Sequence, residues 1–169
     1  SGNTAFNGGG IYALIGTSAV TINNSTFSGN SASTAGGGIY TGSTTMISNS
    51  TITNNSAPNG AGLYRAGGTA TIDHTIIAAQ SSGADCFGTI IDNGYNLDSD
   101  NTNSCVFSGT SKNITNFTLP ALANNGGPTK THALISGGAG NQAIDAGNTT
   151  CGVTTDQRGE PRPVNYTPL

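Results

Sequence analysis

The sequence predicts an all-β fold, a right-handed parallel β-helix with about 25 residues per coil. Three segments align without a gap: VTINNSTFSGNS (20–31), TMISNSTITNNS (45–56) and ATIDHTIIAAQS (70–81). A fixed period of this size is the signature of stacked supersecondary units. Each copy also holds β-branched residues in short alternating runs, which Gly and Asn interrupt too often for a helix. Three short strands and three bends fill one such period, so each period is one coil.

The apolar residues of the three segments form columns at the same repeat positions. One column is Ile22, Ile47 and Ile72, and another is Phe27, Ile52 and Ile77. Gly, Ser, Thr and Asn dominate the composition, and only 8% of the residues are charged. Disordered chains are usually richer in charge and lack ordered apolar recurrence. The columns therefore predict a narrow, stacked core.

Asparagines form two further columns, Asn24 with Asn49 and Asn30 with Asn55. Side-chain amides at the strand spacing can bond to one another along a stack. Asn also tolerates the left-handed conformation that bends require. We interpret both columns as structural, and we expect His74, which takes the place of a column Asn, to make a similar hydrogen bond.

A glycine-rich motif precedes a strand in each of the first three coils, at residues 8–12, 36–40 and 60–64 (GGGIY, GGGIY and GAGLY). These glycines fit a bend that needs positive φ or close backbone approach, after which Ile or Leu enters the core. The motif at 8–12 belongs to an incomplete first coil. Residue 1 aligns just after the repeat position that Phe27 occupies in the next coil, so the strand before it is missing. We expect a cap or another chain to fill the missing strand, or a longer precursor to have been cut there.

A fainter fourth coil follows, in which Leu97 lies 25 residues after Ile72. Cys86 and Cys105 bracket this coil, and the simplest interpretation of their spacing is a disulfide that closes it. Cys151 then has no partner in this pairing. Three alternatives stay open for it: a free thiol, a disulfide to another chain, or replacement of Cys86 or Cys105 in the disulfide.

From about residue 113 the 25-residue repeat is no longer recognisable. We therefore divide the chain into coils (1–112) and a β-rich C-terminal module with an extended tail (113–169). This module packs on the solenoid or continues it. Residues 119–128 are rich in turn signals, and 131–135 and 142–147 read as short strands. Prolines make the tail from residue 155 extended.

Composition also excludes several classes of function. A net charge of −3 leaves no basic patch for nucleic acid, and no apolar run is long enough to span a membrane. The few lysines and the cysteines suit an extracellular or cell-surface protein. No signal peptide is visible, so we expect a mature, processed or trimmed chain.

The GGGIY motifs and Phe27-Ser-Gly-Asn30 resemble repeats of chlamydial polymorphic outer-membrane proteins. More specific likenesses lie in the second half, in NLDSD (96–100), LANNGGPTKTHAL (122–134), AIDAG (143–147) and TDQRGEPRP (155–163). Together they resemble bacterial surface proteins that carry a choice-of-anchor Q domain and right-handed parallel β-helix repeats. The resemblance implies an exported β-helix with a C-terminal module packed on it. The ending at 164–169 departs from the Gly-x-x-Asp-Ile-Gly type that such proteins usually carry.

Polysaccharide chemistry needs paired carboxylates, or an acidic Ca²⁺ site with a basic proton acceptor. The available acids are Asp73, Asp92, Asp98 and Asp100, and the available bases are Arg65 and Lys112. Asp73 falls beside the asparagine column, and Asp98-Ser-Asp100 lacks the rest of a calcium loop. We therefore expect no enzymatic activity, no cofactor and no metal.

Sequons place candidate surface glycosylation sites at Asn113, Asn116, Asn148 and Asn165. Covalent glycans and surface polysaccharide are therefore possible partners, beside further copies of the chain.

The sequence favours an extracellular structural protein whose subunits associate head to tail into a filament. Solenoid ends without polar caps stack on one another, and head-to-tail contact does not close. A sharper hypothesis is strand exchange, in which a neighbour's tail supplies the missing first strand. The candidate contact residues are Val164, Tyr166, Leu169, Ser1 and Phe6.

Two alternatives stay open. One is a surface adhesin or glycan-binding β-helix that presents Tyr12, Tyr40 and Tyr64, although edge packing of tyrosines is the commoner reason for such a column. The other is a polysaccharide lyase or hydrolase.

Overall fold

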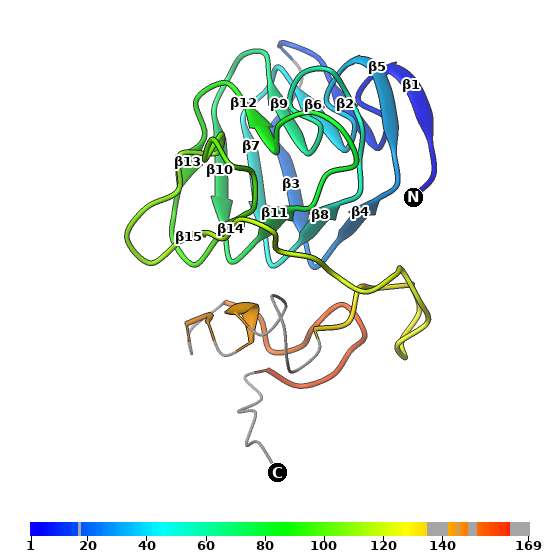
Figure 1. The fold of residues 1–169 in the computed structure, drawn as a ribbon, viewed down its shortest axis with the longest axis vertical. Helices are drawn as coiled ribbons and strands as arrows, with labels where there is room; N and C mark the ends of the chain where they lie inside the picture. Colours follow the sequence, from blue (N-terminus) through cyan, green and yellow to red (C-terminus); the bar gives the residue numbers. More distant parts are fainter. Residues whose placement is uncertain (17, 135–141, 145, 149–151, 163–169) are drawn as a thin grey trace.

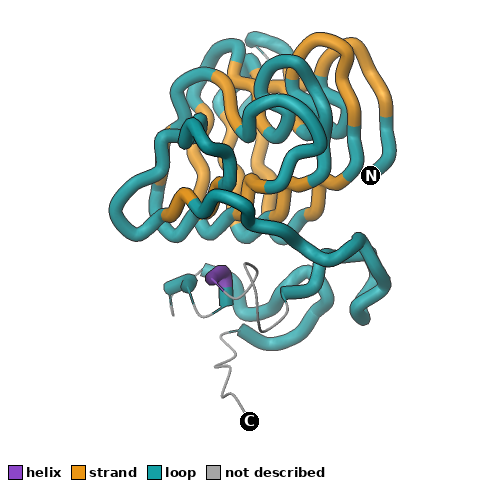
Figure 2. The backbone as a smooth tube through the Cα atoms, in the orientation of Figure 1, coloured by secondary structure: helices purple, strands orange, loops and turns teal. Residues whose placement is uncertain are grey.

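The computed structural model describes residues 1–16, 18–134, 142–144, 146–148 and 152–162, and it forms a parallel β-helix of about four coils (Figure 1). The strands stack into a solenoid, and the described residues after 113 lie along one outer side of it as loops, turns and one short helical turn (Figure 2). The predicted all-β, parallel β-helix fold is confirmed.

Fifteen short strands make up the coils. They are β1 (Thr4–Asn7), β2 (Ile11–Ala13), β3 (Val20–Asn23), β4 (Thr26–Ser28), β5 (Ser31–Ala35), β6 (Ile39–Thr41), β7 (Thr45–Ser48), β8 (Thr51–Thr53), β9 (Leu63–Arg65), β10 (Ala70–Asp73), β11 (Ile76–Ala78), β12 (Cys86–Phe87), β13 (Ile91–Asp92), β14 (Leu97–Asp98) and β15 (Lys112–Asn113).

Each strand pairs in parallel with the equivalent strand of the next coil, which gives three sheets that run the length of the solenoid. Their orders are β13-β10-β7-β3, β15-β14-β11-β8-β4 and β12-β9-β6-β2, and β1 pairs with β5 in a small fourth sheet. The β14–β15 ladder reaches Asn113, so the stacking continues to the predicted boundary at residue 112.

The sequence period sets the register of the first three coils. Ile22 pairs with Ile47 and Ile47 with Ile72, while Phe27, Ile52 and Ile77 align in the same way. Apart from Ile22 and Phe27 at the N-terminal end, these side chains have no exposed surface. Burial of this kind contributes about 1.5–3 kcal/mol per side chain and is the main source of stability in so polar a chain.

The fourth coil does not keep the period, so the prediction that Leu97 takes the slot after Ile72 is wrong. Ile72 instead pairs with Asp92, and Leu97 pairs with Ile76. The coil is shorter because residues 79–85 and 88–90 form shorter connections than residues 54–62 and 66–69 do.

The glycine motifs form tight bends, and the first glycine of each motif has a positive φ (Gly8, Gly36 and Gly60). Gly36 has a φ of +66°, and a Cβ built on it would lie 2.6 Å from the carbonyl oxygen of Ile39. Gly37 has ordinary φ, but a Cβ there would lie 2.5 Å from the carbonyl oxygen of Ser56 in the next coil. Both conditions, positive φ and close approach, therefore act within one motif.

A ladder of buried amides runs beside the apolar core. Asn30 donates through Nδ2 to Oδ1 of Asn55 (3.0 Å), and Asn55 donates in the same way to Oε1 of Gln80 (3.2 Å). The backbone N–H of Asn30 and that of Asn55 donate to the same two acceptors. Asn3 adds a further rung by donating to Oδ1 of Asn30. The ladder satisfies polar groups that the narrow core cannot expose to water.

An aromatic ladder lies on the outside of the β12-β9-β6-β2 sheet. Tyr12, Tyr40, Tyr64 and Phe87 follow one another with ring centroids 4.8–5.1 Å apart. Tyr40, Tyr64 and Phe87 therefore stack at the strand spacing, and Tyr12 packs on Tyr40 at an interplanar angle of 47°.

The two ends of the solenoid core differ. At the C-terminal end the loop after β14 returns Cys105 and Phe107 to the core, where both are buried with Ile90. At the N-terminal end Val20 and Phe27 are only partly buried, and no described strand pairs with the outer edges of β3 and β4.

The C-terminal module holds little regular structure in its described part. Thr131 forms only an isolated antiparallel bridge with Ala123, and residues 142–143 form a short 3₁₀ turn. The strands predicted at 131–135 and 142–147 are therefore not found there. Among the described residues, no helix has the length and apolar character needed to cross a membrane.

Candidate functional site

Four equivalent bends place a side chain on the same outer edge of the solenoid. They join β3 to β4, β7 to β8, β10 to β11 and β13 to β14, and they hold Asn24, Asn49, His74 and Tyr95. All four residues have φ between 46° and 56°, the left-handed conformation that favours Asn in bends. We call these four residues the turn column.

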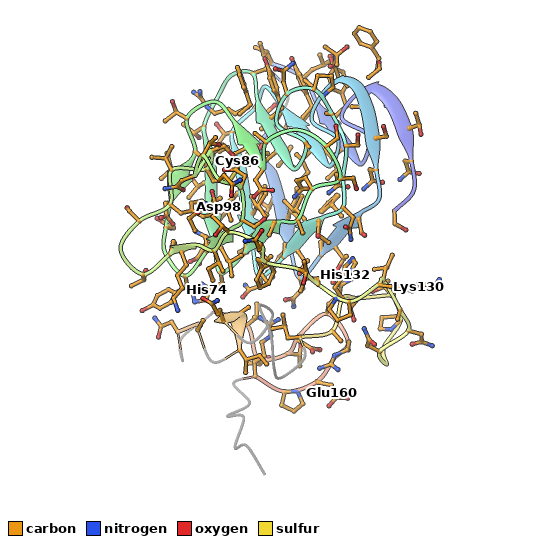
Figure 3. The ribbon with its side chains drawn as sticks, in the orientation of Figure 1. His74, Cys86, Asp98, Lys130, His132 and Glu160 are labelled. Carbon is orange, nitrogen blue, oxygen red and sulfur yellow. A yellow bond between two sulfur atoms is a disulfide. The ribbon has the colours of Figure 1, made fainter. Side chains whose placement is uncertain are left out.

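The C-terminal module lies against the turn column (Figures 1 and 3). Asn24 donates through Nδ2 to the carbonyl oxygen of Thr155 (3.1 Å), and Arg162 donates through Nη1 to Oδ1 of Asn49 (3.2 Å). His132 bonds through Nε2 to the Ser28 hydroxyl (2.9 Å) and through Nδ1 to the carbonyl oxygen of Pro120. The turn column is thus the surface on which the module docks.

A cavity of about 590 Å³ lies between the turn column and the module. Its solenoid wall includes Asn49, His74 and Tyr95, and its module wall includes Asn125 and Arg158. The volume is in the range of small-molecule sites in proteins.

One ion pair is part of the module wall. Arg158 donates through Nε and Nη2 to Oδ2 of Asp156, each at 2.7 Å. Burial works to raise the pKa of Asp156, but hydrogen bonds from Arg158 and from the backbone of Glu160 outweigh it and hold the pKa below its ordinary value.

His74 has two defined contacts and one open position. Its Nδ1 lies 2.8 Å from Oδ1 of Asp73, and its ring stacks on Tyr95 at a centroid distance of 5.0 Å. Its Nε2 is buried, and it has no hydrogen-bond partner among the described residues. A buried nitrogen without a partner is unfavourable, so this atom marks a place where a ligand or water group would be stabilised.

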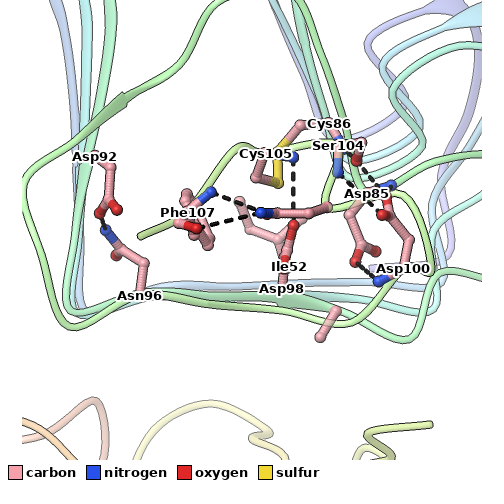
Figure 4. Close-up of a disulfide and its surroundings, with 12 residues drawn as sticks. Ile52, Asp85, Cys86, Asp92, Asn96, Asp98, Asp100, Ser104, Cys105 and Phe107 are labelled. Carbon is pink, nitrogen blue, oxygen red and sulfur yellow. Dashed lines mark hydrogen bonds between the residues drawn. A yellow bond between two sulfur atoms is a disulfide. The ribbon is translucent and has the colours of Figure 1, made fainter. Parts of the chain in front are cut away.

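A second cluster lies at the C-terminal end of the solenoid, beside the disulfide (Figure 4). Carboxylate oxygens of Asp85, Asp98 and Asp100 all lie within 4.8 Å of one another. The predicted disulfide between Cys86 and Cys105 is confirmed, and it links the strand after Asp85 to the loop after Asp100.

Hydrogen-bond donors surround the carboxylates of this cluster. Oδ2 of Asp85 accepts from the backbone N–H groups of Ser99 (2.8 Å) and Asp100 (3.0 Å). Asp100 accepts from the backbone of Asp85, Thr102 and Ser104. These three aspartates are the described residues with the best geometry for a cation, but their oxygens already have protein donors. The arrangement fits a structural closure of the last coil.

The electrostatics of the cluster are unusual. Burial raises the pKa of Asp85 to about 6, and the neighbouring Asp100 carboxylate adds to the rise. Burial also raises the pKa of Asp98 to about 6. For Asp100, burial works in the same direction, but hydrogen bonds from Ser104 and from the Asp85 and Thr102 groups lower its pKa below the ordinary value.

These pKa values predict that the protein is more stable at pH 5 than at pH 7.5. With folded pKa values of about 6 against 3.8, Asp85 and Asp98 bind more protons in the folded state between those values. Stability therefore falls as the pH rises through this window, by about 1–3 kcal/mol in all. Below about pH 4 the lowered pKa values of Asp92, Asp100 and Asp156 act in the opposite direction. Thermal unfolding from pH 3.5 to pH 8 measures both the loss of stability above pH 5 and the loss below about pH 4.

The control for this prediction is Asp85→Asn, which removes one titrating group. The Ser99 and Asp100 amides donate to the same oxygen of Asp85, so an amide can keep both bonds. We expect a flatter profile between pH 5 and 7.5. A wild-type melting temperature that rises over this interval would contradict the assignment.

The structure separates the residues that the sequence suggested for catalysis. Asp92 accepts bonds from Asn96 and Ser111 inside the last coil, and the guanidinium of Arg65 donates to the carbonyl oxygen of Gly68 in its own turn. Lys112 lines the cavity, and no described ion pair joins it to Asp92 or to another acid. Asp98 and Asp100 are the exception among these candidates, because they come together in the cluster with Asp85.

The other suggested residues occupy varied positions. Asn113 donates through Nδ2 to Asp98 and to the carbonyl oxygen of Asp100 (2.8 Å), so a glycan there would break both bonds. Asn116, Ser1 and Phe6 are exposed, whereas Asn148 is half-buried at the cavity wall. The remaining residues suggested for glycosylation, subunit contact or disulfide exchange lie outside the described residues: Asn165, Val164, Tyr166, Leu169 and Cys151.

Sequence reasoning missed Asp85, Tyr95 and Arg162 as parts of these two sites. Tyr95 follows Gly94 in an Asn-Gly-Tyr-Asn stretch, which is a bend signal at the position of the asparagine column. Asp85 carries no comparable signal, because it occupies no repeated position.

Comparisons with protein-family models, with curated proteins and with solved structures found no match to this chain. The fold and the two sites therefore define its class, a parallel β-helix whose C-terminal module docks on one row of bends.

Proposed function

We propose that the protein is a non-enzymatic, extracellular structural subunit that associates head to tail. The observation that carries the proposal is where its exposed apolar side chains lie. Nine large apolar side chains are exposed among the described residues, and seven of them belong to the ends of the solenoid. Phe6, Tyr12, Leu14 and Ile15 lie in the first coil, and Phe87, Ile91 and Val106 lie in the last two. Exposed apolar groups gathered in this way mark interaction surfaces.

The sheet edges support the same proposal. β2 and β12 are the outer strands of one sheet, and no described strand pairs with the outer edge of either, although the Cys86 N–H of β12 donates to the Ser104 hydroxyl. If β2 of one copy pairs with β12 of a neighbouring copy, the sheet continues across the junction. The aromatic ladder then continues as well, with Tyr12 of the first copy stacking on Phe87 of the second. Contact between two different ends is heterologous and generates a filament.

Val106 gives independent support at the C-terminal end. It is β-branched, 71% exposed, and has a φ of 57°. A β-branched residue in this conformation costs about 1–2 kcal/mol, and its exposed side chain recovers little of that within the subunit. Contact with a neighbouring copy would explain why valine is there.

We expect Val106→Asn to stabilise the isolated subunit by about 1 kcal/mol and to weaken association. Asn tolerates positive φ and removes apolar surface from the interface. Urea unfolding measures the first effect, and sedimentation velocity across a concentration series measures the second. Met46→Asn is the control, because Met46 is equally apolar and 52% exposed but lies on β7, away from both ends. Equal loss of association in both variants would contradict the proposal.

Electron microscopy of the purified protein tests the assembly directly. We expect filaments whose repeat matches one stacked subunit, and monodisperse monomers at high concentration would remove the proposal. Strand exchange is the finer form of the same proposal, with residues 164–169 of one copy pairing at the N-terminal edge of another. Under strand exchange, deleting these six residues leaves folded monomers. Filaments that persist after the deletion would contradict strand exchange and leave end-to-end stacking as the mode of association.

The extracellular location rests on the disulfide, since such bonds persist in oxidising compartments. Surface glycans on exposed asparagines such as Asn116 are consistent with it.

A glycan-binding adhesin is the second candidate function, and the cavity is the observation that favours it. The aromatic ladder does not, because each inner ring packs against its neighbours and leaves no face for a sugar. Glycan-array binding by the subunit tests this alternative.

A further inference from the structure

The basic residues of this acidic protein gather at one place. The chain has five Lys and Arg residues and two His, against eight Asp and Glu. Three of those five cations, Lys112, Arg158 and Arg162, line the cavity between the turn column and the module, and so do both histidines. Asp156 is the only acid among the described lining residues. The cavity is therefore a region of positive potential on a chain of net charge −3.

The pairing of these cations leaves charge available to a ligand. Arg158 is neutralised by Asp156, and Arg162 bonds to the uncharged amide oxygen of Asn49. No acidic side chain among the described residues forms an ion pair with Lys112. Within the described part of the chain, Lys112 and Arg162 thus carry charge that no ion pair compensates.

The rest of the lining suits a polyhydroxylated molecule. Eleven of the 27 described lining residues carry an uncharged amide or an aliphatic hydroxyl, among them Asn125 and Gln157. Apolar surface from Ile76, Leu97 and Leu119 lies between them. Nε2 of His74 adds a buried hydrogen-bonding atom that has no partner among the described residues. A sugar ring presents both hydroxyl groups and apolar C–H faces, so it matches this mixture.

We propose that this cavity binds a carboxylated saccharide of one or two residues, such as a uronic acid, with its carboxylate at Lys112. A volume of about 590 Å³ accommodates a ligand of that size. The carboxylate forms a charge-assisted hydrogen bond with the Lys112 ammonium, while the ring hydroxyls bond to the amides and to His74. The site is independent of head-to-tail association.

Isothermal titration with D-galacturonate tests the proposal, and D-galactose is the matched ligand that lacks only the carboxylate. We expect galacturonate to bind and galactose to bind at least about tenfold more weakly, the loss of one charge-assisted bond. Lys112→Gln is expected to lower galacturonate affinity by a similar factor. Lys130→Gln is the control, because Lys130 is exposed and does not line this cavity.

His74→Asn supplies a second variant that keeps the fold, since Asn is the turn-column residue in two other coils. We expect it to weaken both sugars by the same factor, because His74 is assigned to the ring and not to the carboxylate. Absence of galacturonate binding to the wild-type protein would overturn the proposal. Equal affinity for the two sugars, or equal losses in Lys112→Gln and Lys130→Gln, would overturn it as well.

Discussion

Replacing both Cys86 and Cys105 with alanine is expected to lower the free energy of unfolding by about 2–5 kcal/mol. The disulfide joins residues 19 apart, and closing a loop of that length restricts the unfolded chain by about 3 kcal/mol. Both cysteines are also buried in the core cluster, so alanine leaves small cavities. The loop that the bond holds carries Phe107, which closes the end of the core.

Urea unfolding with and without reductant measures this effect. Reduced wild-type protein should approach the double variant, and the oxidised form should differ from both. If oxidised wild-type protein and the double variant share one midpoint, the loop is held by its carboxylate hydrogen bonds instead.

Asn55→Ala is expected to lower the free energy of unfolding by about 3–5 kcal/mol. Oδ1 of Asn55 accepts two bonds from Asn30, and its Nδ2 donates to Gln80 and to the carbonyl oxygen of Phe27. Removing the amide takes this partner from two buried donors of Asn30 and from the Phe27 carbonyl oxygen, while Gln80 keeps the backbone N–H of residue 55. Each buried group left unsatisfied costs about 1–3 kcal/mol. The ladder is continuous, so the defect affects the coil on either side.

Asn59→Ala is the matched control for that change. Asn59 is exposed and donates one bond to the carbonyl oxygen of Thr34, so its loss should cost less than about 1 kcal/mol. Chemical unfolding of the two variants side by side gives the comparison. Similar losses would mean that water enters the ladder and replaces the missing amide.

The regular part of the fold was predictable because the same residue types recur at the same position in each coil. A parallel β-helix places equivalent residues directly above one another, so the 25-residue recurrence of Ile22, Ile47 and Ile72 defines the strand register. The disulfide followed from two cysteines in a coil short enough to close. Left-handed bends at Asn24 and Asn49 followed from the conformational preference of Asn.

Prediction failed where the repeat ended. Leu97 keeps the 25-residue spacing in the sequence, yet it pairs with Ile76, because shortened connections change the register of the last coil. The C-terminal residues carry turn signals without a period, so the sequence does not indicate which face of the solenoid they cover. The cluster of Asp85 with Asp98 and Asp100 also joins segments that share no repeat position.

The sequence by itself therefore determined the stacked coils, their register through three periods, the bends and the disulfide. Each of these depends on a residue type at a fixed interval, which is visible without coordinates. Only the tertiary structure decided the docking of the module on the turn column, the gathering of Lys112, Arg158 and Arg162 at one cavity, and the raised pKa values of Asp85 and Asp98. These features arise from contacts between segments distant in sequence, where the sign and strength of an interaction depend on burial and distance.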